Sequence, residues 1–482
     1  MSLDSAYQPS IGLEVHIQLA TKSKLFAGDS TSYGQPPNTN ISVITLAHPG
    51  ILPKLNKQAV EYAIRMGLAC GCEISRYCIF DRKNYFYPDL PKGFQTTQDR
   101  TPICLGGEVT VQVGDKEKSI ILNRIHLEED AGKSIHDENS DESLIDLNRA
   151  GVPLIELVTE PSIHSAEEAM AFLTEIRRMV RYLEICDGNM EEGSLRCDAN
   201  ISVRKTSDSE LGKKVEIKNM NSIRNVGRAI DFEIQRQIEL LKEGEEVISE
   251  TRLFNADKGT TLSMRTKEEL NDYRYFPEPD LSPFEVSDEW LSEIKHAMPA
   301  TPRMMRERFM TDYQLSSYDA SVLTDAKEMA IFFEEVCGKT KNYKAVANWL
   351  MGPIKSIINE QKEDEIVIPI TSDQLAQLVD AIEEGQLSFS LGSKQVLPYL
   401  ISNSEKSVAE SIVDLRLDTS QDDVSDVILK VLESFPDKVK AYKSGKKNLM
   451  GLFMGEVMKK TNGTADPKKT NELLRDALEK WN

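Results

Sequence analysis

The sequence has no long hydrophobic segment, few cysteines and no excess of positive charge. No apolar run reaches the roughly 20 residues that a membrane-spanning helix needs. The opening residues MSLDSAYQPS lack the basic and apolar regions of a signal peptide, so none is expected. Seven cysteines in 482 residues do not make a disulfide framework, which favours a reducing, cytoplasmic location. The net charge of −20 argues against general nucleic-acid binding, which requires lysine and arginine.

The two common glycine-rich phosphate-binding loops are also missing. Gly132-Lys133-Ser134 resembles the end of a Walker A loop, but position 127, where the earlier glycine is required, is Leu127. No G-x-G-x-x-G pattern stands between a strand and a helix pattern. If the chain binds a nucleotide, a metal ion and basic side chains must hold it.

Four cysteines stand close enough in the sequence to raise the question of zinc: Cys70, Cys72, Cys78 and Cys104. They lack the C-x₂₋₄-C pairs of structural zinc sites. Buried thiols are therefore the favoured interpretation, and a zinc site the alternative.

Alternating hydrophobicity predicts short strands in the first 290 or so residues, at Ile11–Leu19, Gly107–Val113, Ser119–Asp130 and 198–204. Two helices are expected among them. One follows Ser165, which forms a capping box with Glu168, and the other runs from about Ile223 to Lys242 with Gly244 as its stop. A proline-dense linker is expected at 277–283, and mostly helical patterns follow it. The fold class is α+β, with one α+β body followed by two small α domains.

Acidic residues and one histidine recur on the polar faces of the predicted strands. Glu14 and His16 are two apart on one strand, so they project from the same face. The other acidic positions are Glu128 beside His126, Glu156 within an apolar run, and the group Glu191, Glu192 and Asp198. Such a set suits Mg²⁺, which prefers oxygen ligands. The alternatives are ordinary solvent-facing strand surfaces and, for Glu156, a pairing with Arg149.

The C-terminal end is basic although the chain is acidic. From Ser434 onward there are eleven basic and six acidic residues. This pattern indicates either a local contact with a polyanion or a solvated helix face with lysine-rich loops.

Taken together, six stretches resemble the GatB family, the B subunits of the aspartyl/glutamyl-tRNA amidotransferases. They are 11–18 (IGLEVHIQ), 81–89 (DRKNYFYPD), 126–133 (HLEEDAGK), 146–156 (DLNRAGVPLIE), 190–202 (MEEGSLRCDANIS) and 272–280 (DYRYFPEPD), and the tail pattern at 451–467 also fits. These stretches are long, ordered and spread through the first 280 residues, so the match is far more specific than a short motif.

The resemblance implies a fold and an activity. The family has an N-terminal cradle similar in fold to glutamine synthetase, here 1–294, then a helical domain, 295–404, and a tail domain, 405–482. It activates the side-chain carboxylate of misacylated Glu-tRNA(Gln) or Asp-tRNA(Asn) with ATP as an acyl phosphate, which ammonia converts to the amide. The glutaminase partner, GatA, supplies the ammonia, and a small third partner, GatC, joins GatA to GatB. No glutaminase motif is found in this chain, which is expected to receive ammonia from a partner.

The resemblance also implies roles for individual residues. Catalytic roles fall to Glu14, His16 and Glu129, the last as acceptor of the proton released when ammonium enters the site. The implied Mg²⁺ ligands are Glu14, His16, Glu128, Glu129, Glu156, Glu191, Glu192 and Asp198, with partial tolerance of Mn²⁺ because of the imidazole. The implied ammonia passage contains Lys83 and Lys92, for which structural salt bridges are the alternative. The implied tRNA contacts are Lys443, Lys446, Lys447, Lys459, Lys460, Lys468 and Lys469.

Two other functions compete with this one. The first is a self-standing ligase, similar to glutamine synthetase, that acts on a free amino acid. The second is a tRNA-binding scaffold without catalysis. The basic tail and the appended helical domains favour tRNA over a free amino acid, and the acidic positions favour catalysis over scaffolding.

Overall fold

The computed structural model describes residues 5–136, 142–266, 273–361, 366–415, 421–461, 465 and 467–481. The chain divides into two compact units, the first ending at Pro302. The protein is of mixed α/β type, with a large sheet in the first unit and many helices. No helix in the described ranges is both long and apolar enough to cross a lipid bilayer.

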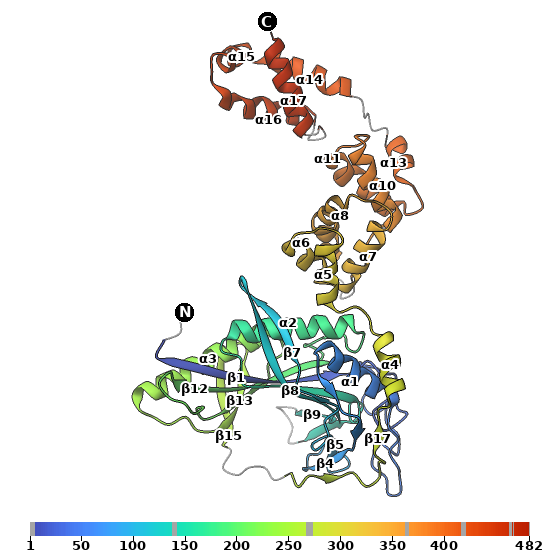
Figure 1. Ribbon diagram of the computed structural model, residues 1–482, viewed down its shortest axis with the longest axis vertical. Helices are drawn as coiled ribbons and strands as arrows, with labels where there is room; N and C mark the ends of the chain where they lie inside the picture. Colours follow the sequence, from blue (N-terminus) through green and yellow to red (C-terminus); the bar gives the residue numbers. More distant parts are fainter. Residues whose placement is uncertain are drawn as a thin grey trace. The chain divides into compact units, whose positions relative to one another are not determined.

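A ten-stranded sheet forms the centre of the first unit (Figure 1). Its order is β15-β14-β13-β12-β1-β11-β8-β6-β2, and β7 pairs with β8 beside this path. The strands are β1 (Tyr7–Gln18), β2 (Glu73–Ile74), β6 (Cys104–Leu105), β7 (Glu108–Val113), β8 (Lys116–Glu129), β11 (Pro153–Thr159), β12 (Leu195–Lys205), β13 (Val215–Lys218), β14 (Glu250–Asn255) and β15 (Thr260–Thr266). The pairing places β1 between β11 and β12, which come much later in the chain.

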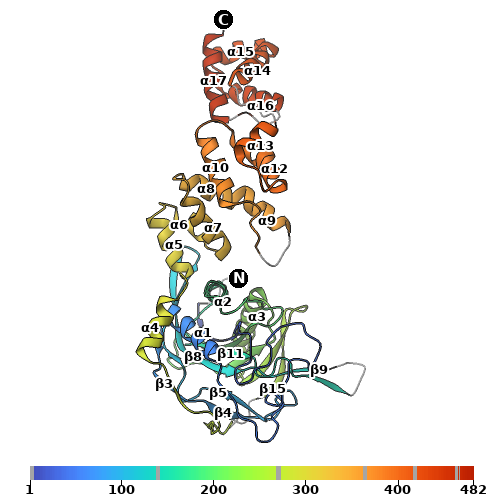
Figure 2. The ribbon, with the colours of Figure 1, turned by 90° about the vertical axis from the view of Figure 1, so that its right-hand side faces the viewer.

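One face of this sheet is covered by helices α1 (Lys57–Ala69), α2 (Ala166–Tyr182) and α3 (Ile223–Glu243), as Figures 1 and 2 show. Ile11, Leu13, Val15 and Ile17 of β1 are fully buried, whereas the residues between them are only partly buried. Because side chains alternate along a strand, the polar residues of β1 project from the face without these helices. The period-two prediction for this segment is confirmed.

The helix boundaries follow the predicted caps. Gly244 ends α3 in the left-handed region with φ 78°, as expected of a C-terminal glycine. The Ser165 hydroxyl accepts from the Glu168 N–H at the start of α2, but the Glu168 carboxylate accepts from the His164 N–H. The expected capping box is therefore present in its forward bond, while the return bond goes to the residue before the cap.

Strand β8 contains an irregularity that the alternation did not predict. Arg124 is paired with Val158 and Leu122 with Thr159, so Asn123 is an extra residue at this point. The extra residue reverses the alternation. Ile121, expected on the same side as Ile125 and Leu127, is therefore 42% exposed, while Ile120 is buried in its place.

Smaller pairings and a further helix complete the first unit. They are β16 (Phe276–Pro277), β4 (Asp81–Asn84) and β5 (Phe94–Thr97) in one sheet, β9 (Lys133–His136) with β10 (Ser143–Asp146), β3 (Tyr77–Cys78) with β17 (Phe284–Glu285), and α4 (Asp288–His296). The prediction of a linker at 277–283 is wrong, because Pro277 pairs with β4 and Glu278 accepts two 2.7 Å hydrogen bonds from Arg82. The predicted domain boundary between 294 and 295 falls inside α4.

The second unit is built from helices. They are α5 (Pro302–Thr311), α6 (Ser317–Leu323), α7 (Lys327–Cys337), α8 (Tyr343–Trp349), η1 (Leu350–Ile354), α9 (Lys355–Gln361), α10 (Ser372–Glu383), α11 (Phe389–Leu391), η2 (Gly392–Val396), α12 (Leu397–Ser402), α13 (Val408–Asp414), α14 (Gln421–Ser434), α15 (Pro436–Lys443), η3 (Lys447–Leu449), α16 (Met450–Lys460) and α17 (Pro467–Lys480). Helices α14 to α17 surround a hydrophobic core of their own, in which Val431, Phe453 and Leu474 are fully buried.

Candidate metal centre

The polar face of the main sheet carries a row of ionisable side chains from four neighbouring strands. His16 on β1 is directly opposite Glu156 on β11, and Glu156 is directly opposite His126 on β8. On the other side, His16 is opposite Arg196 on β12. Residues opposite each other on paired strands share a face of the sheet, so the register alone brings these four side chains together.

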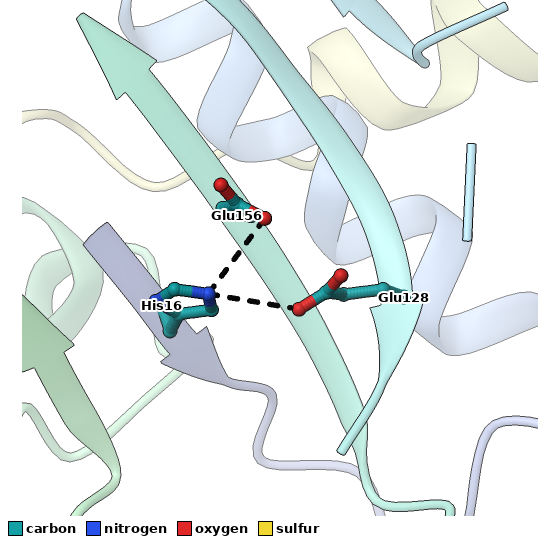
Figure 3. Close-up of side chains that lie close together, drawn as sticks. All are labelled: His16, Glu128 and Glu156. Atoms are coloured by element: carbon teal, nitrogen blue, oxygen red, sulfur yellow. Dashed lines mark ion pairs between the residues drawn. The ribbon is translucent and has the colours of Figure 1, made fainter. Parts of the chain in front are cut away.

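The first cluster is the His16 group, made of His16, Glu128 and Glu156, whose possible ligand atoms lie within 4.8 Å of one another. The Nε2 atom of His16 is 3.7 Å from a carboxylate oxygen of Glu128 and 3.7 Å from one of Glu156 (Figure 3). One imidazole and two carboxylates from three different strands thus converge on one point. Such a set of donors is able to hold a divalent cation.

A second histidine, His126, lies beside both carboxylates of the His16 group and affects the ionisation of Glu156. Its Nε2 atom lies 3.3 Å from Glu156 and 3.7 Å from Glu128. Burial by itself favours neutral imidazole, but the Glu156 and Glu128 carboxylates outweigh it and raise the pKa of His126 to about 9. Burial likewise opposes ionisation of Glu156, yet His126, His16 and Lys83 hold its pKa below the usual range. Glu156 is therefore a carboxylate at neutral pH.

The second cluster is the Glu14 group, made of Glu14, Asp198 and Glu216, again with ligand atoms within 4.8 Å of one another. Glu14 and Asp198 are opposite each other on β1 and β12, and Glu216 lies on β13. Burial, together with Glu156, Glu216 and Asp198, raises the pKa of Glu14, although Asn200 donates a 2.9 Å hydrogen bond to it. Lys218 pairs with Asp198 and, at 3.0 Å, with Glu216.

The chemistry of both groups fits hard divalent cations. The raised pKa of Glu14 reports burial first and then crowded negative charge, which a bound Mg²⁺ would relieve. Glu14 and His16 are two residues apart on one strand face, so the two groups lie about 7 Å apart along β1. The sheet thus presents two adjacent candidate cation sites, which share no residue.

The structure separates Glu128 from its neighbour Glu129, as the strand alternation predicts. Glu128 faces the His16 group, whereas Glu129 pairs with Lys92 and accepts a 2.8 Å hydrogen bond from the Thr96 N–H. Glu129 and Lys92 line a pocket that also contains the buried Lys24. Glu129 thus lies beside the centre without joining either group.

Lys83, the other residue predicted for the ammonia passage, does not line the pocket of Glu129 and Lys92 but lies near the His16 group. Its ammonium is 4.9 Å from the ring centre of Tyr273 and 5.7 Å from that of Tyr85. Burial acts to lower the pKa of Lys83, but Glu128, Tyr275 and Glu156 outweigh this and raise it. Lys83 and Lys92 therefore lie beside neighbouring carboxylates of β8, Glu128 and Glu129.

Sequence reasoning missed some contributors and grouped others too broadly. Glu216 and His126 are part of the centre but were not proposed as site residues. The alternation of Val215 and Ile217, both fully buried, with Glu216 and Lys218 was a usable signal.

Glu191 and Glu192 are exposed and lie in a separate cleft, so the structure does not bring them into either group. Glu156 meets histidines rather than Arg149, which binds Ala131, Gly132 and Asp130.

The four clustered cysteines are buried, and their thiols contact four different neighbours, with Cys78 donating to the Ser75 carbonyl. Cys70 contacts the Met179 sulfur, Cys72 donates to the Gly106 carbonyl, and Cys104 donates to the Ala63 carbonyl. These contacts are those of small core side chains.

The tail lysines occupy two separate places. Lys443, Lys446 and Lys447 are exposed before α16, and Lys459 and Lys460 are exposed at its end. The side chains of Lys468 and Lys469 lie outside the described part of the chain. An eleven-residue helix is about 16 Å long, so the two sets are at opposite ends of α16.

Two family models match this chain. A model described as the GatB/GatE catalytic domain matches residues 9–292, and one described as the GatB domain matches residues 331–478. The chain is 46% identical over 474 residues to the B subunit of the aspartyl/glutamyl-tRNA(Asn/Gln) amidotransferase of Thermoanaerobacter sp. (strain X514), covering 98% of this chain and 100% of the relative. The same-named proteins of Thioalkalivibrio sulfidiphilus and Caldicellulosiruptor bescii are also 46% identical, over 480 and 478 residues, covering 98% of this chain and 100% and 99% of the relatives.

Proposed function

This chain belongs to the GatB family of amidotransferase subunits, and from that premise we propose that it is the component that activates and amidates misacylated tRNA. Its substrates are Glu-tRNA(Gln), Asp-tRNA(Asn) or both, and its products are the matching Gln-tRNA and Asn-tRNA. The observation that carries the proposal is the pair of candidate cation sites on one sheet face, the His16 group and the Glu14 group.

The reaction has two steps. The side-chain carboxylate of the aminoacyl group attacks the γ-phosphate of ATP, which forms an acyl phosphate and releases ADP. Ammonia then attacks the acyl carbon, the amide bond forms, and phosphate leaves. Both reactants of the first step are anions, so neutralising their charge is the main requirement for catalysis.

The residues of the two groups would hold Mg²⁺, with Mn²⁺ tolerated because of the imidazole of His16. Mg²⁺ bound there supplies charge neutralisation for the phosphates of ATP. Lys83, which stays protonated beside Glu128, adds a fixed positive charge on the same side. Glu129 lies one residue further along β8 and takes the proton that is released when ammonium becomes ammonia.

Ammonia reaches the centre from a partner. We assign the glutaminase GatA as its source and the small protein GatC as the link between GatA and this chain, in a heterotrimer. Lys92 lies beside Glu129, and Lys83 lies beside Glu128. We propose that the ammonia passage runs from Lys92 and Glu129 to Lys83 and Glu128. The seven unpaired cysteines suit a complex that works in the reducing cytoplasm.

We further propose that residues 1–294 form a cradle similar in fold to glutamine synthetase, with a helical domain at 295–404 and a tRNA-contacting tail at 405–482. The separate core of α14 to α17 supports an independent tail, and the exposed lysines at both ends of α16 support its contact with tRNA.

The test is co-purification with candidate GatA and GatC proteins, followed by ATP-dependent amidation of Glu-tRNA(Gln) and Asp-tRNA(Asn). Amide formation on at least one tRNA is expected with glutamine or with ammonium chloride. A free glutamate that is amidated without tRNA would instead indicate the self-standing ligase. Binding of tRNA without any amidation would indicate a scaffold.

A further inference from the structure

A pocket of about 280 Å³ is lined by Lys24, Lys92, Glu129 and Gly151, among other residues. The proposed function uses Lys92 and Glu129 but gives Lys24 no role. Lys24 is 1% exposed, and its ammonium forms no ion pair with a carboxylate in the described part of the chain. Burying an unpaired ammonium costs stability, so Lys24 is a candidate for a part in the reaction.

Gly151 leaves the space between Lys24 and Glu129 open. Its φ of 84° is in the left-handed region, which favours glycine. A Cβ at this position would lie 3.4 Å from the Cδ of Lys24 and 3.9 Å from a carboxylate oxygen of Glu129. The two side chains therefore flank one small space, which a side chain at position 151 would fill.

A chain of hydrogen-bonding groups continues from Lys24 to Asp29. The Nζ atom of Lys24 lies 3.5 Å from the Thr45 hydroxyl and 3.3 Å from the Leu147 carbonyl oxygen. The Thr45 hydroxyl donates in turn to the Asp29 carboxylate, which also accepts a 2.9 Å hydrogen bond from the Ser42 hydroxyl. Asp29 is only partly buried, so the chain leads from a buried amine toward solvent.

The ionisation of Lys24 suits proton transfer. Burial lowers the pKa of its ammonium to about 8, although Asp29, Asp146 and Glu129 act in the opposite direction. At pH 7 about a tenth of Lys24 is therefore neutral and able to accept a proton, and a base works best when its pKa is near the working pH. The other ionisable side chains that line the pocket are His48, Arg82, Lys92, Asp130, Glu278 and Asp280.

We propose that Lys24, Thr45 and Asp29 form the path by which the proton that Glu129 takes from ammonium leaves the protein. The neutral amine of Lys24 receives this proton from Glu129 through a water molecule in the space beside Gly151. The Lys24 ammonium then gives a proton to the Thr45 oxygen while the Thr45 hydroxyl gives its own to Asp29, which releases it to solvent. One proton enters and one leaves in each cycle, so every group returns to its starting form. This inference rests on the proposed function and specifies how its proton acceptor is restored.

The path serves one nitrogen source and not the other. When neutral ammonia attacks the acyl phosphate, two of its hydrogens stay in the amide and the third leaves with the phosphate as HPO₄²⁻. Ammonium brings one proton more, which must leave before the nitrogen can attack. A defect in the path should therefore slow amidation with ammonium chloride, whereas glutamine hydrolysis in the partner delivers neutral ammonia.

The first experiment compares the two nitrogen sources in the complete heterotrimer. Lys24→Met is expected to lower kcat/KM for ammonium about tenfold at pH 7, while glutamine-driven amidation changes less than twofold. The glutamine-driven rate also shows that the variant is folded and assembled. Lys22→Met, at an exposed neighbouring position, is the control and should behave like the wild type with both sources.

The pH profile of ammonium-driven amidation separates a proton path from a structural role. In Lys24→Met only the ammonia already present in solution reacts, and its share of the total rises with pH. The tenfold deficit at pH 7 should therefore shrink to less than twofold at pH 9. A deficit that is the same at every pH, or equal for both nitrogen sources, would make Lys24 a fixed structural cation and overturn the inference. A wild-type complex that forms no amide from either source would instead mean that the proposed function has failed.

The second experiment interrupts the path beyond Lys24. Thr45→Val removes the hydroxyl between Lys24 and Asp29 and is expected to reproduce the ammonium-specific, pH-dependent deficit of Lys24→Met. Thr45→Ser keeps a hydroxyl at this position and should restore the wild-type rate. Ser42→Ala removes the other hydroxyl that donates to Asp29, outside the path, and is the matched control. A Thr45→Val complex with the wild-type pH profile would exclude this path.

Discussion

His16 and Glu156 stand directly opposite each other on β1 and β11, with 3.7 Å between Nε2 and the nearest carboxylate oxygen. Glu156 is in turn opposite His126 on β8. Because side chains alternate along a strand, a slip of β11 by one residue would turn Glu156 to the helix-covered face. The candidate metal centre therefore depends on the register of the central strands.

Removing one ligand from each group should weaken metal binding and the reaction together. Glu156→Gln and Glu216→Gln are each expected to lower ammonium-driven amidation at least 100-fold, because phosphoryl transfer needs the neutralised charge. Titration with Mn²⁺ should show one site fewer in each variant. Glu108→Gln, an exposed carboxylate of β7, is the control. Normal activity in both ligand variants would refute the metal assignment.

Replacing the passage lysines should separate the two nitrogen sources. Lys92→Met removes the partner of Glu129, and Lys83→Met removes the ammonium near Glu128. For each variant we expect the ratio of glutamine-driven to ammonium-driven amidation to fall about tenfold, since ammonium chloride enters without the passage. The two rates are measured on the same heterotrimer preparation. If both rates fall equally, the lysine in question does not serve the passage.

The tail lysines should contribute to tRNA affinity through phosphate contacts. Lys446→Ala/Lys447→Ala is expected to weaken tRNA binding and to lower the slope of log K against log salt by about 1 to 2. The maximal amidation rate at saturating tRNA should stay unchanged. Lys213→Ala/Lys214→Ala, which changes two consecutive exposed lysines in the first unit, is the matched control. An unchanged slope would contradict the role of this part of the tail.

Alanine substitutions at two adjacent glycines should distinguish the free-energy cost of backbone strain from that of steric overlap. Gly106 and Gly107 both have positive φ, of 63° and 94°. A Cβ on Gly106 would meet open space, whereas one on Gly107 would lie 2.6 Å from the Cys70 carbonyl oxygen. We expect Gly106→Ala to cost about 1 kcal/mol and Gly107→Ala about 2–4 kcal/mol of unfolding free energy. Urea unfolding measures both, and equal losses would exclude the predicted overlap.

The buried Lys24 should make stability depend on alkaline pH. Burial lowers the pKa of its ammonium to about 8, although Asp29, Asp146 and Glu129 oppose this. Between about pH 8 and the ordinary lysine pKa near 10.4, the unfolded chain keeps a proton that the folded chain has released, so stability rises with pH.

The comparison with Lys24→Met isolates this contribution. The wild type should gain on the order of 1 kcal/mol relative to Lys24→Met between pH 8 and pH 10. Lys22→Met, at an exposed neighbouring position, should show no such gain over the same range. Urea unfolding at several pH values provides the measurement. A constant difference between wild type and Lys24→Met would mean that Lys24 stays charged in the folded protein.

The sequence by itself determined the local structure and the family. The alternation from Ile11 to Leu19 predicted both the strand and its polar face, since the period of two is a property of the extended backbone. Ser165 and Gly244 predicted a helix start and a helix end through local hydrogen bonding and φ. The matched stretches, long and in order, indicated the family before any contact between them was known.

Only the tertiary structure decided which of the acidic residues meet. Glu14, Asp198 and Glu216 come from three segments far apart in the chain, and strand pairing between such segments is not encoded in local spacing. The same pairing brought His126 to Glu156, whereas Glu191 and Glu192, in the turn before β12, lie in a separate cleft. Local alternation predicts which face a side chain takes, except where an extra residue such as Asn123 reverses it. The long-range order of strands decides the neighbours of that side chain, and a metal centre depends on both.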